Sequence, residues 1–145
     1  MTPPLTEAAL ALTLVALGGG LGSVARFWVS GVIARRYGET FPWGTLVVNV
    51  TGSAAIGVCA ALLLAPDAPT PDAQVSGLRA AWAGLVLGVL GSYTTVSSFS
   101  LQTLALARSG ETGRALGNVA LSLVLCLGAA AAGWLGMAWL LTGAP

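Results

Sequence analysis

The feature that most constrains the fold is an apolar run from Ala80 to Leu106 with a cluster of hydroxyl side chains inside it. As one helix this run would be about 40 Å long, at ~1.5 Å per residue, which exceeds the ~30 Å thickness of a hydrocarbon core. The hydroxyl cluster lies in the stretch GVLGSYTTVSSFSL, from Gly88 to Leu101. Because glycine relaxes the backbone and hydroxyl groups bond to freed backbone groups, the run is predicted to be a broken helix. Within a membrane such a break persists only where it is buried in protein or lines a wet cavity, so this stretch is a candidate ion site.

The composition of the 145-residue chain indicates a membrane protein. Apolar residues make up 56% of it and charged residues 8%, whereas a soluble domain carries roughly 25% charged residues. A net charge of +1 gives no support to nucleic-acid binding. The chain has no histidine, and both of its cysteines, Cys59 and Cys126, lie inside apolar runs. A disulfide framework, a zinc site or an enzyme is therefore not predicted.

Four apolar runs predict an all-α, single-domain protein that crosses the membrane four times. The expected spans are residues 8–32, 44–64, 80–106 and 115–141, and the proline-rich stretch 65–79 is expected to be an exposed loop. No Lys or Arg precedes the first run, so it is interpreted as a retained span and not as a signal peptide. The connections after the first and third spans carry four arginines against one on the opposite side. The positive-inside rule then places both termini outside the cell.

Two of the expected spans carry a line of polar side chains at four-residue spacing, which places each line on one helix face. In the second span these are Thr45, Asn49 and Ser53, and in the fourth Asn118, Ser122 and Cys126. An asparagine amide in hydrocarbon either joins neighbouring helices or donates to an ion, and spacing leaves both interpretations open.

Arg26 is the only charged residue well inside a span. A structural anchor is favoured over a direct role in an ion path, because an arginine near the end of a span can reach the interface.

The spans contain no acidic residue away from their ends. The five carboxylates are Glu7, Glu39, Asp67, Asp72 and Glu111. A proton-coupled carrier or a cation channel normally needs an acid inside the membrane, so the neutral donors that remain favour a small anion. These are the amides of Asn49 and Asn118 and the hydroxyls of Thr94, Thr95, Ser97, Ser98 and Ser122, with the aromatic side chains of Tyr93 and Phe99. The alternative is that the hydroxyls only bond back to their own helix.

Three stretches of the chain resemble the signatures of the Fluc, or CrcB, family of microbial fluoride channels. They are GGGLGSVARF (18–27), FPWGTLVVNVTGS (41–53) and GVLGSYTTVSSFS (88–100). The resemblance implies a passive, fluoride-selective channel in the cell membrane, built as an antiparallel, dual-topology dimer with a structural sodium ion at its centre. The partner implied is either a second copy or a related chain of opposite orientation, and the arginine imbalance keeps the second possibility open.

The resemblance also implies roles for individual residues. The backbone carbonyls of Gly91 and Thr94 correspond to those that hold sodium, and Arg26 corresponds to an arginine taken as structural. The fluoride pathway corresponds to Asn49, Phe99, Thr94, Thr95, Ser97, Ser122 and Asn118.

The chain departs from the family pattern at three positions. Val96 stands where a first phenylalanine is usual, Asn118 where a tyrosine is common, and Cys126 where a serine is common. Two alternatives come from other classes of protein: a small four-span multidrug exporter and a non-transporting assembly subunit. The exporter class depends on a glutamate in its first span, which is absent here.

Overall fold

The computed structural model describes residues 5–64, 84 and 86–143, and every element in this part of the chain is a helix. The helices are α1 (Leu5–Tyr37), α2 (Trp43–Leu64), α4 (Val96–Arg108) and α5 (Thr112–Thr142). A further helical segment, residues 86–93, precedes α4. The predicted exposed loop at 65–79 and part of the expected third span, 80–83 and 85, lie outside the described residues.

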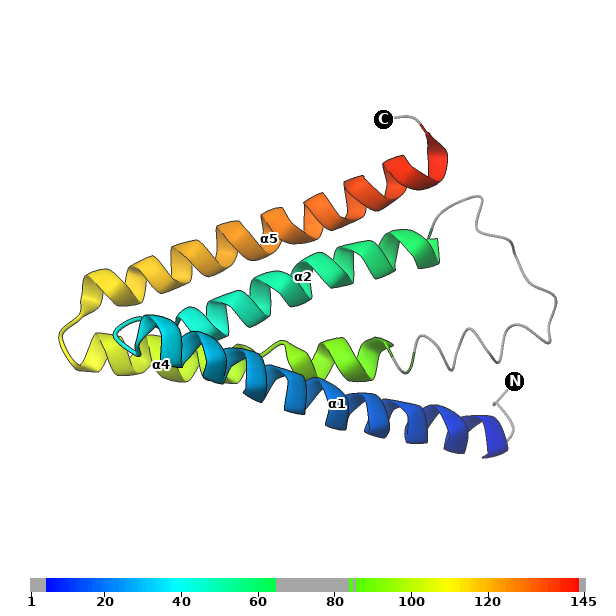
Figure 1. Ribbon diagram of the computed structural model, residues 1–145, viewed down its shortest axis with the longest axis horizontal. Helices are drawn as coiled ribbons and strands as arrows, with labels where there is room; N and C mark the ends of the chain where they lie inside the picture. Colours follow the sequence, from blue (N-terminus) through cyan, green and yellow to red (C-terminus); the bar gives the residue numbers. More distant parts are fainter. Residues whose placement is uncertain (1–4, 65–83, 85, 144–145) are drawn as a thin grey trace.

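The helices run alternately up and down along one long axis. Figure 1 shows α1 running toward the end of the bundle where α2 and α5 begin, so the start of α1 and the end of α5 lie at the opposite end. The segment 86–93 and α4 run in the same direction as α1. The described helices therefore alternate in direction from one end of the bundle to the other.

Helix α2 is the centre of the chain, because it contacts α1, α4 and α5 and its contact with α5 is the most extensive. Small residues allow this contact. A Cβ atom at Gly57 would collide with the carbonyl oxygen of Ala130, and one at Gly133 with that of Ala54. Without side chains in the way, the two backbones approach closely, which is how helices gain packing energy in lipid.

The connection between α1 and α2 is shorter than the sequence indicates. Helix α1 continues past Val32, the expected end of the first span, to Tyr37. It ends at Gly38, whose φ of 78° lies in the left-handed region and whose N–H donates to the carbonyl of Ala34. A glycine in this conformation is a common helix end, since it has no Cβ to strain the backbone. Pro42 then precedes the start of α2, and its carbonyl accepts from Leu46 N–H at 3.1 Å.

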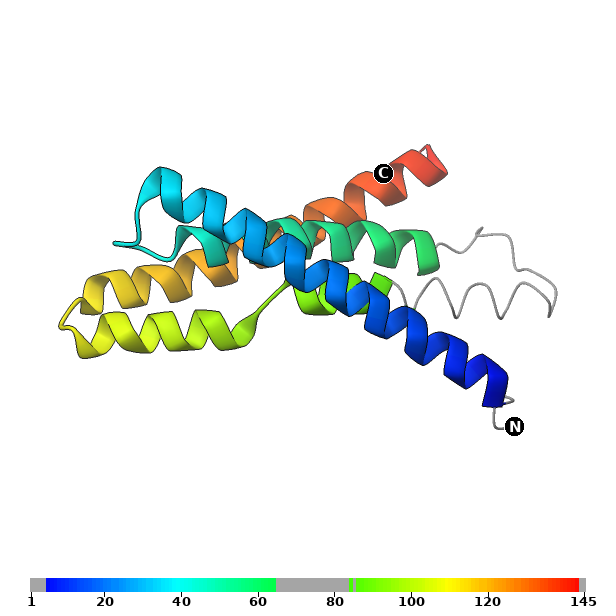
Figure 2. The same ribbon diagram turned by 60° about the horizontal axis from the view of Figure 1, so that its bottom comes forward.

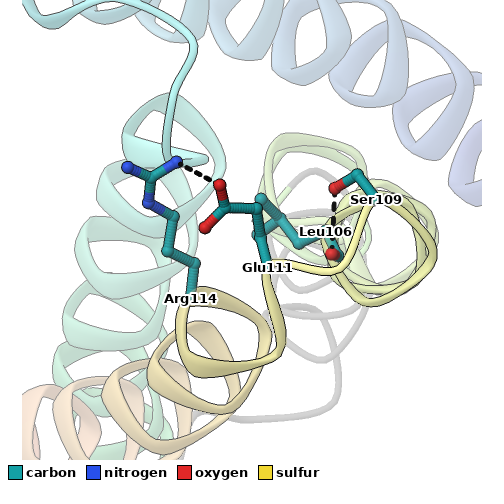
Figure 3. A network of polar contacts seen from close by, with 4 residues as sticks. All are labelled: Leu106, Ser109, Glu111 and Arg114. Atoms are coloured by element: carbon teal, nitrogen blue, oxygen red, sulfur yellow. Dashed lines mark hydrogen bonds and ion pairs between the residues drawn. The ribbon is translucent and has the colours of Figure 1, made fainter.

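A tight turn joins α4 to α5 (Figure 3). Gly110 has a φ of 86°, and the N–H of Glu111 donates to the carbonyl of Leu106 at 2.9 Å. The hydroxyl of Ser109 donates to the same carbonyl at 3.0 Å, and Arg114 pairs with Glu111 at 3.4 Å. These bonds satisfy the end of α4 and set the antiparallel contact of α4 with α5.

Among the residues that the structure describes, three helices are long and apolar enough to cross a membrane: Ala8–Tyr37, Trp43–Leu62 and Thr112–Thr142. The prediction of an all-α, multi-pass membrane protein is confirmed to that extent. Large apolar side chains such as Trp28, Leu125 and Leu135 are exposed on the single chain, as expected for faces that meet lipid or another subunit.

Candidate functional site

The helical backbone is interrupted at Thr94 and Thr95, between the segment 86–93 and α4. Figure 2 shows the short extended link between these two helical pieces near the middle of the molecule. Thr95 has φ −152° and ψ 123°, which is strand-like geometry, and its hydroxyl oxygen accepts from Ser98 N–H at 3.2 Å. That bond caps the start of α4, a role for which threonine is well suited.

Asn49 of α2 satisfies the backbone that the interruption exposes. Its Nδ2 donates to the Thr95 carbonyl at 2.8 Å, and its Oδ1 accepts from the Thr95 N–H at 2.8 Å. Thr95 is only 7% exposed, so both backbone groups would otherwise lack partners. The side chain thus joins two helices, and one of its two amide hydrogens makes no hydrogen bond within the described chain.

The pairing of Thr95 with Asn49 affects the hydrogen bonding of two neighbouring backbone carbonyl groups. In a continuous helix the Thr95 N–H would donate to the Gly91 carbonyl, and the Ser98 N–H to that of Thr94. These two N–H groups instead donate to Asn49 and to the Thr95 hydroxyl. Both carbonyl oxygens therefore lack their usual helical donor. Gly91 is also exposed, and a Cβ there would meet nothing within 4 Å.

This arrangement fits a hard cation, because carbonyl oxygens without a donor are the ligands that such ions prefer. Gly91 and Thr94 would be the residues that supply them from this chain. The sodium site implied by the sequence resemblance stays a prediction.

The other residues predicted for an anion path differ in their hydrogen bonds and in their exposure. The Thr94 hydroxyl donates to the Leu90 carbonyl at 2.8 Å. This bond is of the kind expected from the alternative interpretation, in which the hydroxyls bond back to their own helix. Ser97 is exposed and its hydroxyl lies 3.2 Å from that of Thr95. Phe99 and Ser122 are half-buried on α4 and α5.

Asn118 lies deep in the contact between α4 and α5. It is 1% exposed, and its Nδ2 donates to the Thr103 hydroxyl at 2.8 Å, which in turn donates to the Phe99 carbonyl. In the single chain Asn118 therefore joins two helices, as Asn49 does.

Two cavities lie beside the interruption, between α1, α2 and α4. The inner one has a volume of about 250 Å³. It is lined by Ser23, Arg26, Phe27, Ser30, Thr45, Val48, Thr95 and Ser98. The outer one, of about 660 Å³, is lined by the end of α1, the connection at 38–42, the start of α2 and one face of α4. Phe27, Ser30, Thr45 and Ser98 line both, so the two cavities adjoin.

The cavities contain polar groups without partners in the described chain. Arg26 lines the inner cavity, and no hydrogen bond or ion pair of its side chain is found among the described residues. Gln102 lines the outer cavity, and its Oε1 is buried without a hydrogen-bond partner. Since the oxygen and nitrogen of a side-chain amide are assigned from their surroundings, either end of this amide can face a ligand.

Sequence reasoning missed Gln102 and the part that Ser23 and Ser30 play. The available signal for Gln102 was that it is the one side-chain amide in the run 80–106. The serines of α1 lie within four residues of Arg26 on either side, which was the signal for a polar face there.

The fold and this site define a multi-pass membrane protein in which a polar cavity offers neutral donors and a guanidinium. Residues 13–134 match the family model for CrcB-like protein, Camphor Resistance (CrcB). The chain belongs to this family, also called Fluc.

Several curated relatives support this assignment. The chain is 54% identical over 123 residues to "Fluoride-specific ion channel FluC 2" of Rhodopseudomonas palustris (strain BisB18), covering 85% of this chain and 89% of the relative. It is 55% identical over 122 residues to "Fluoride-specific ion channel FluC" of Opitutus terrae (strain DSM 11246 / JCM 15787 / PB90-1), covering 84% and 86%.

Proposed function

We propose that this chain forms a fluoride-selective channel that lowers cytoplasmic fluoride by passive export across the cell membrane. The observation that carries the proposal is the inner cavity between α1, α2 and the start of α4, of which α1 and α2 are long enough to span a membrane. Its polar lining consists of hydroxyl groups and a guanidinium, without a carboxylate. Such a lining attracts an anion and replaces part of its hydration shell with hydroxyl hydrogens. The fluoride channels among the relatives support the choice of ion.

Arg26 has a direct electrostatic role in this proposal, in addition to the structural role predicted from the sequence. A half-buried guanidinium without an ion-pair partner among the described residues raises the local anion concentration more than a fully solvated charge does. Glu39 lines only the outer cavity, so it is not next to the ion at the inner position.

The path continues from the inner cavity to the interruption and beyond it. Thr95 and Ser98 line the cavity and also form the cap of α4. The remaining members of the proposed path are Asn49, Thr94, Ser97, Phe99, Asn118 and Ser122. The free amide hydrogen of Asn49 and the electropositive ring edge of Phe99 are the groups that would contact fluoride directly.

A structural sodium ion is part of the proposal. Two chains placed with their interruptions facing each other would supply the carbonyls of Gly91 and Thr94 from both sides. When bound, the ion neutralises the negative ends of these carbonyl dipoles and holds the two interruptions together.

The chain is proposed to work as an antiparallel dimer, because the exposed polar residues near Thr94 need a covering surface within the membrane. The partner is a second copy or a related chain of opposite orientation. Single cysteines placed in the connections, labelled from each side of the membrane in cells that lack any related chain, would distinguish the two. Labelling from both sides supports the homodimer, and labelling from one side excludes it.

Fluoride efflux from liposomes tests the proposed function. Purified protein should release fluoride without a pH gradient and pass little chloride, and Phe99→Leu or Asn49→Leu should abolish most of the flux. Trp139→Leu is the matched control, since Trp139 is exposed on α5 and lines neither cavity. A requirement for a pH gradient would favour the multidrug-type exporter. Absence of any flux, with or without a related chain, would favour the non-transporting subunit and overturn the proposal.

A further inference from the structure

A second contact joins α2 to the interrupted stretch, on the other side of Thr94 from Asn49. The hydroxyl oxygens of Thr51 and Tyr93 lie 2.9 Å apart. Tyr93 is the last helical residue before the interruption, while Thr95 is held by Asn49. Thr94 therefore lies between two tethers that both start from α2.

The direction of this hydrogen bond follows from the other bonds of Thr51. Its hydroxyl donates to the Val47 carbonyl at 2.8 Å, with the Val48 carbonyl at 3.2 Å. A hydroxyl has one hydrogen, so the Thr51 oxygen is left as an acceptor for the tyrosine. Tyr93 is therefore the donor, and the bond depends on a single hydrogen that a phenylalanine would lack.

The surface of α2 between the two tethers fits the interrupted stretch closely. A Cβ atom at Gly52 would collide with the Thr94 methyl group and lie 3.2 Å from Cδ1 of Tyr93. The absence of a side chain at Gly52 thus lets Thr94 lie against α2. The position of Thr94 is fixed by packing in addition to the two tethers.

We propose that Tyr93 and Thr51 form a positioning pair that holds the carbonyl groups of Gly91 and Thr94 in the orientation required to bind sodium. The inference rests on the sodium site of the proposed function and adds two side chains that do not touch the ion. Gly91 lies in the last helical turn, which Tyr93 ties to α2. If this hydrogen bond is lost, the turn and its carbonyl groups gain rotational freedom. The entropy lost when the ion orders them again then weakens ion binding.

The experiment measures the stability of the purified protein in detergent as a function of sodium concentration, with N-methylglucamine as the replacing cation. A ligand that binds only the folded state raises the melting temperature, so the midpoint of the sodium dependence reports affinity without any measurement of flux. Tyr93→Phe and Thr51→Val should each raise the sodium midpoint about two- to tenfold, the range expected for loss of one hydrogen bond. The double variant should show no larger shift than either single variant, because both remove the same bond.

Three further variants make the test specific. Tyr37→Phe makes the same chemical change at an exposed tyrosine of α1, and Thr13→Val removes a hydroxyl that bonds only to its own helix. Both should leave the sodium midpoint unchanged. Thr51→Ser keeps the acceptor oxygen and should restore the wild-type midpoint even if Thr51→Val lowers overall stability.

The outcomes separate this inference from the proposed function. An unchanged sodium midpoint in Tyr93→Phe and Thr51→Val, with normal sodium dependence in the wild type, would overturn the positioning pair and leave the channel intact. A wild type whose stability ignores sodium would overturn both the sodium site and the pair, while fluoride flux would still support the channel. A wild type that binds sodium and passes no fluoride would overturn the channel alone.

Discussion

The interruption at Thr95 and the cavity beside it are both polar, but their polar groups are satisfied to very different degrees. At the interruption, Asn49 pairs with both backbone groups of Thr95. In the cavities, Arg26 and the buried Oε1 of Gln102 have no hydrogen-bond partner among the described residues. Paired groups stabilise one conformation, whereas unpaired buried groups reduce stability unless a ligand binds them. The first region is therefore interpreted as a framework that also presents the second amide hydrogen of Asn49 to the proposed path, and the second as a place where unpaired groups can bind an ion.

The largest effect is expected from Asn49→Leu, which removes the side chain that pairs with the interruption. The change leaves the N–H and C=O of Thr95 without partners, at about 1–3 kcal/mol for each group. The melting temperature in detergent should fall strongly and fluoride flux should be lost. Asn118→Leu is the comparison, because within the described residues the Asn118 side chain makes one hydrogen bond, to the Thr103 hydroxyl. A smaller loss of stability for Asn49→Leu than for Asn118→Leu would contradict the framework interpretation.

The next largest effect is expected from Gly52→Ala, which tests the same region through packing. The new methyl group collides with the Thr94 side chain and should destabilise the protein by about 1–3 kcal/mol. Gly136→Ala on α5 is the matched control, since a Cβ there meets nothing within 4 Å. Alanine is the better helix former, so the control should raise stability by up to about 1 kcal/mol. Equal effects of the two changes on the melting temperature would show that Thr94 does not need the space at Gly52.

Much of this framework could be predicted from the sequence. The hydroxyl cluster singled out the stretch 88–101, and the two residues outside helical geometry, Thr94 and Thr95, lie in it. Apolar length gave the positions of α2 and α5 to within a few residues, and four-residue spacing singled out Asn49. Such features can be found in a sequence because they depend on local chain properties: helix length, polarity and spacing.

What the sequence could not provide are the partners of these residues. The bond of Asn49 to Thr95 joins residues 46 positions apart, and no local pattern specifies it. The end of α1 was missed although Gly38 follows two arginines, a common pattern at helix ends, because apolar length was weighed above it. Gln102 was missed because its burial arises from α1, α2 and α4 together.

Removal of an unpaired polar group from the cavities should change the stability of the protein in the opposite direction to the mutations at the interruption. Gln102→Leu removes a buried polar atom without a partner, so the melting temperature should stay constant or rise, by about 1 kcal/mol in free energy. Fluoride flux should fall about tenfold, a factor that corresponds to ~1.4 kcal/mol of ion stabilisation. Thr13→Val, which removes one polar group from an exposed face of α1, should change neither quantity. A Gln102→Leu protein that is strongly destabilised would place Gln102 in the framework instead.

The smallest effect is expected at Val96, where the family pattern has a phenylalanine. Val96 is 77% exposed on the single chain, so Phe at this position displaces no neighbour within the protomer and should change stability by less than about 0.5 kcal/mol. The added ring offers a second electropositive edge one turn before Phe99, on the proposed path. Fluoride flux should therefore rise, by about twofold, while Val124→Phe on α5, at 69% exposure, should leave it unchanged. A Val96→Phe protein that conducts less than wild type would indicate that the partner chain already occupies this space. The surface around Thr94 would then be framework toward the partner chain as well as toward α2.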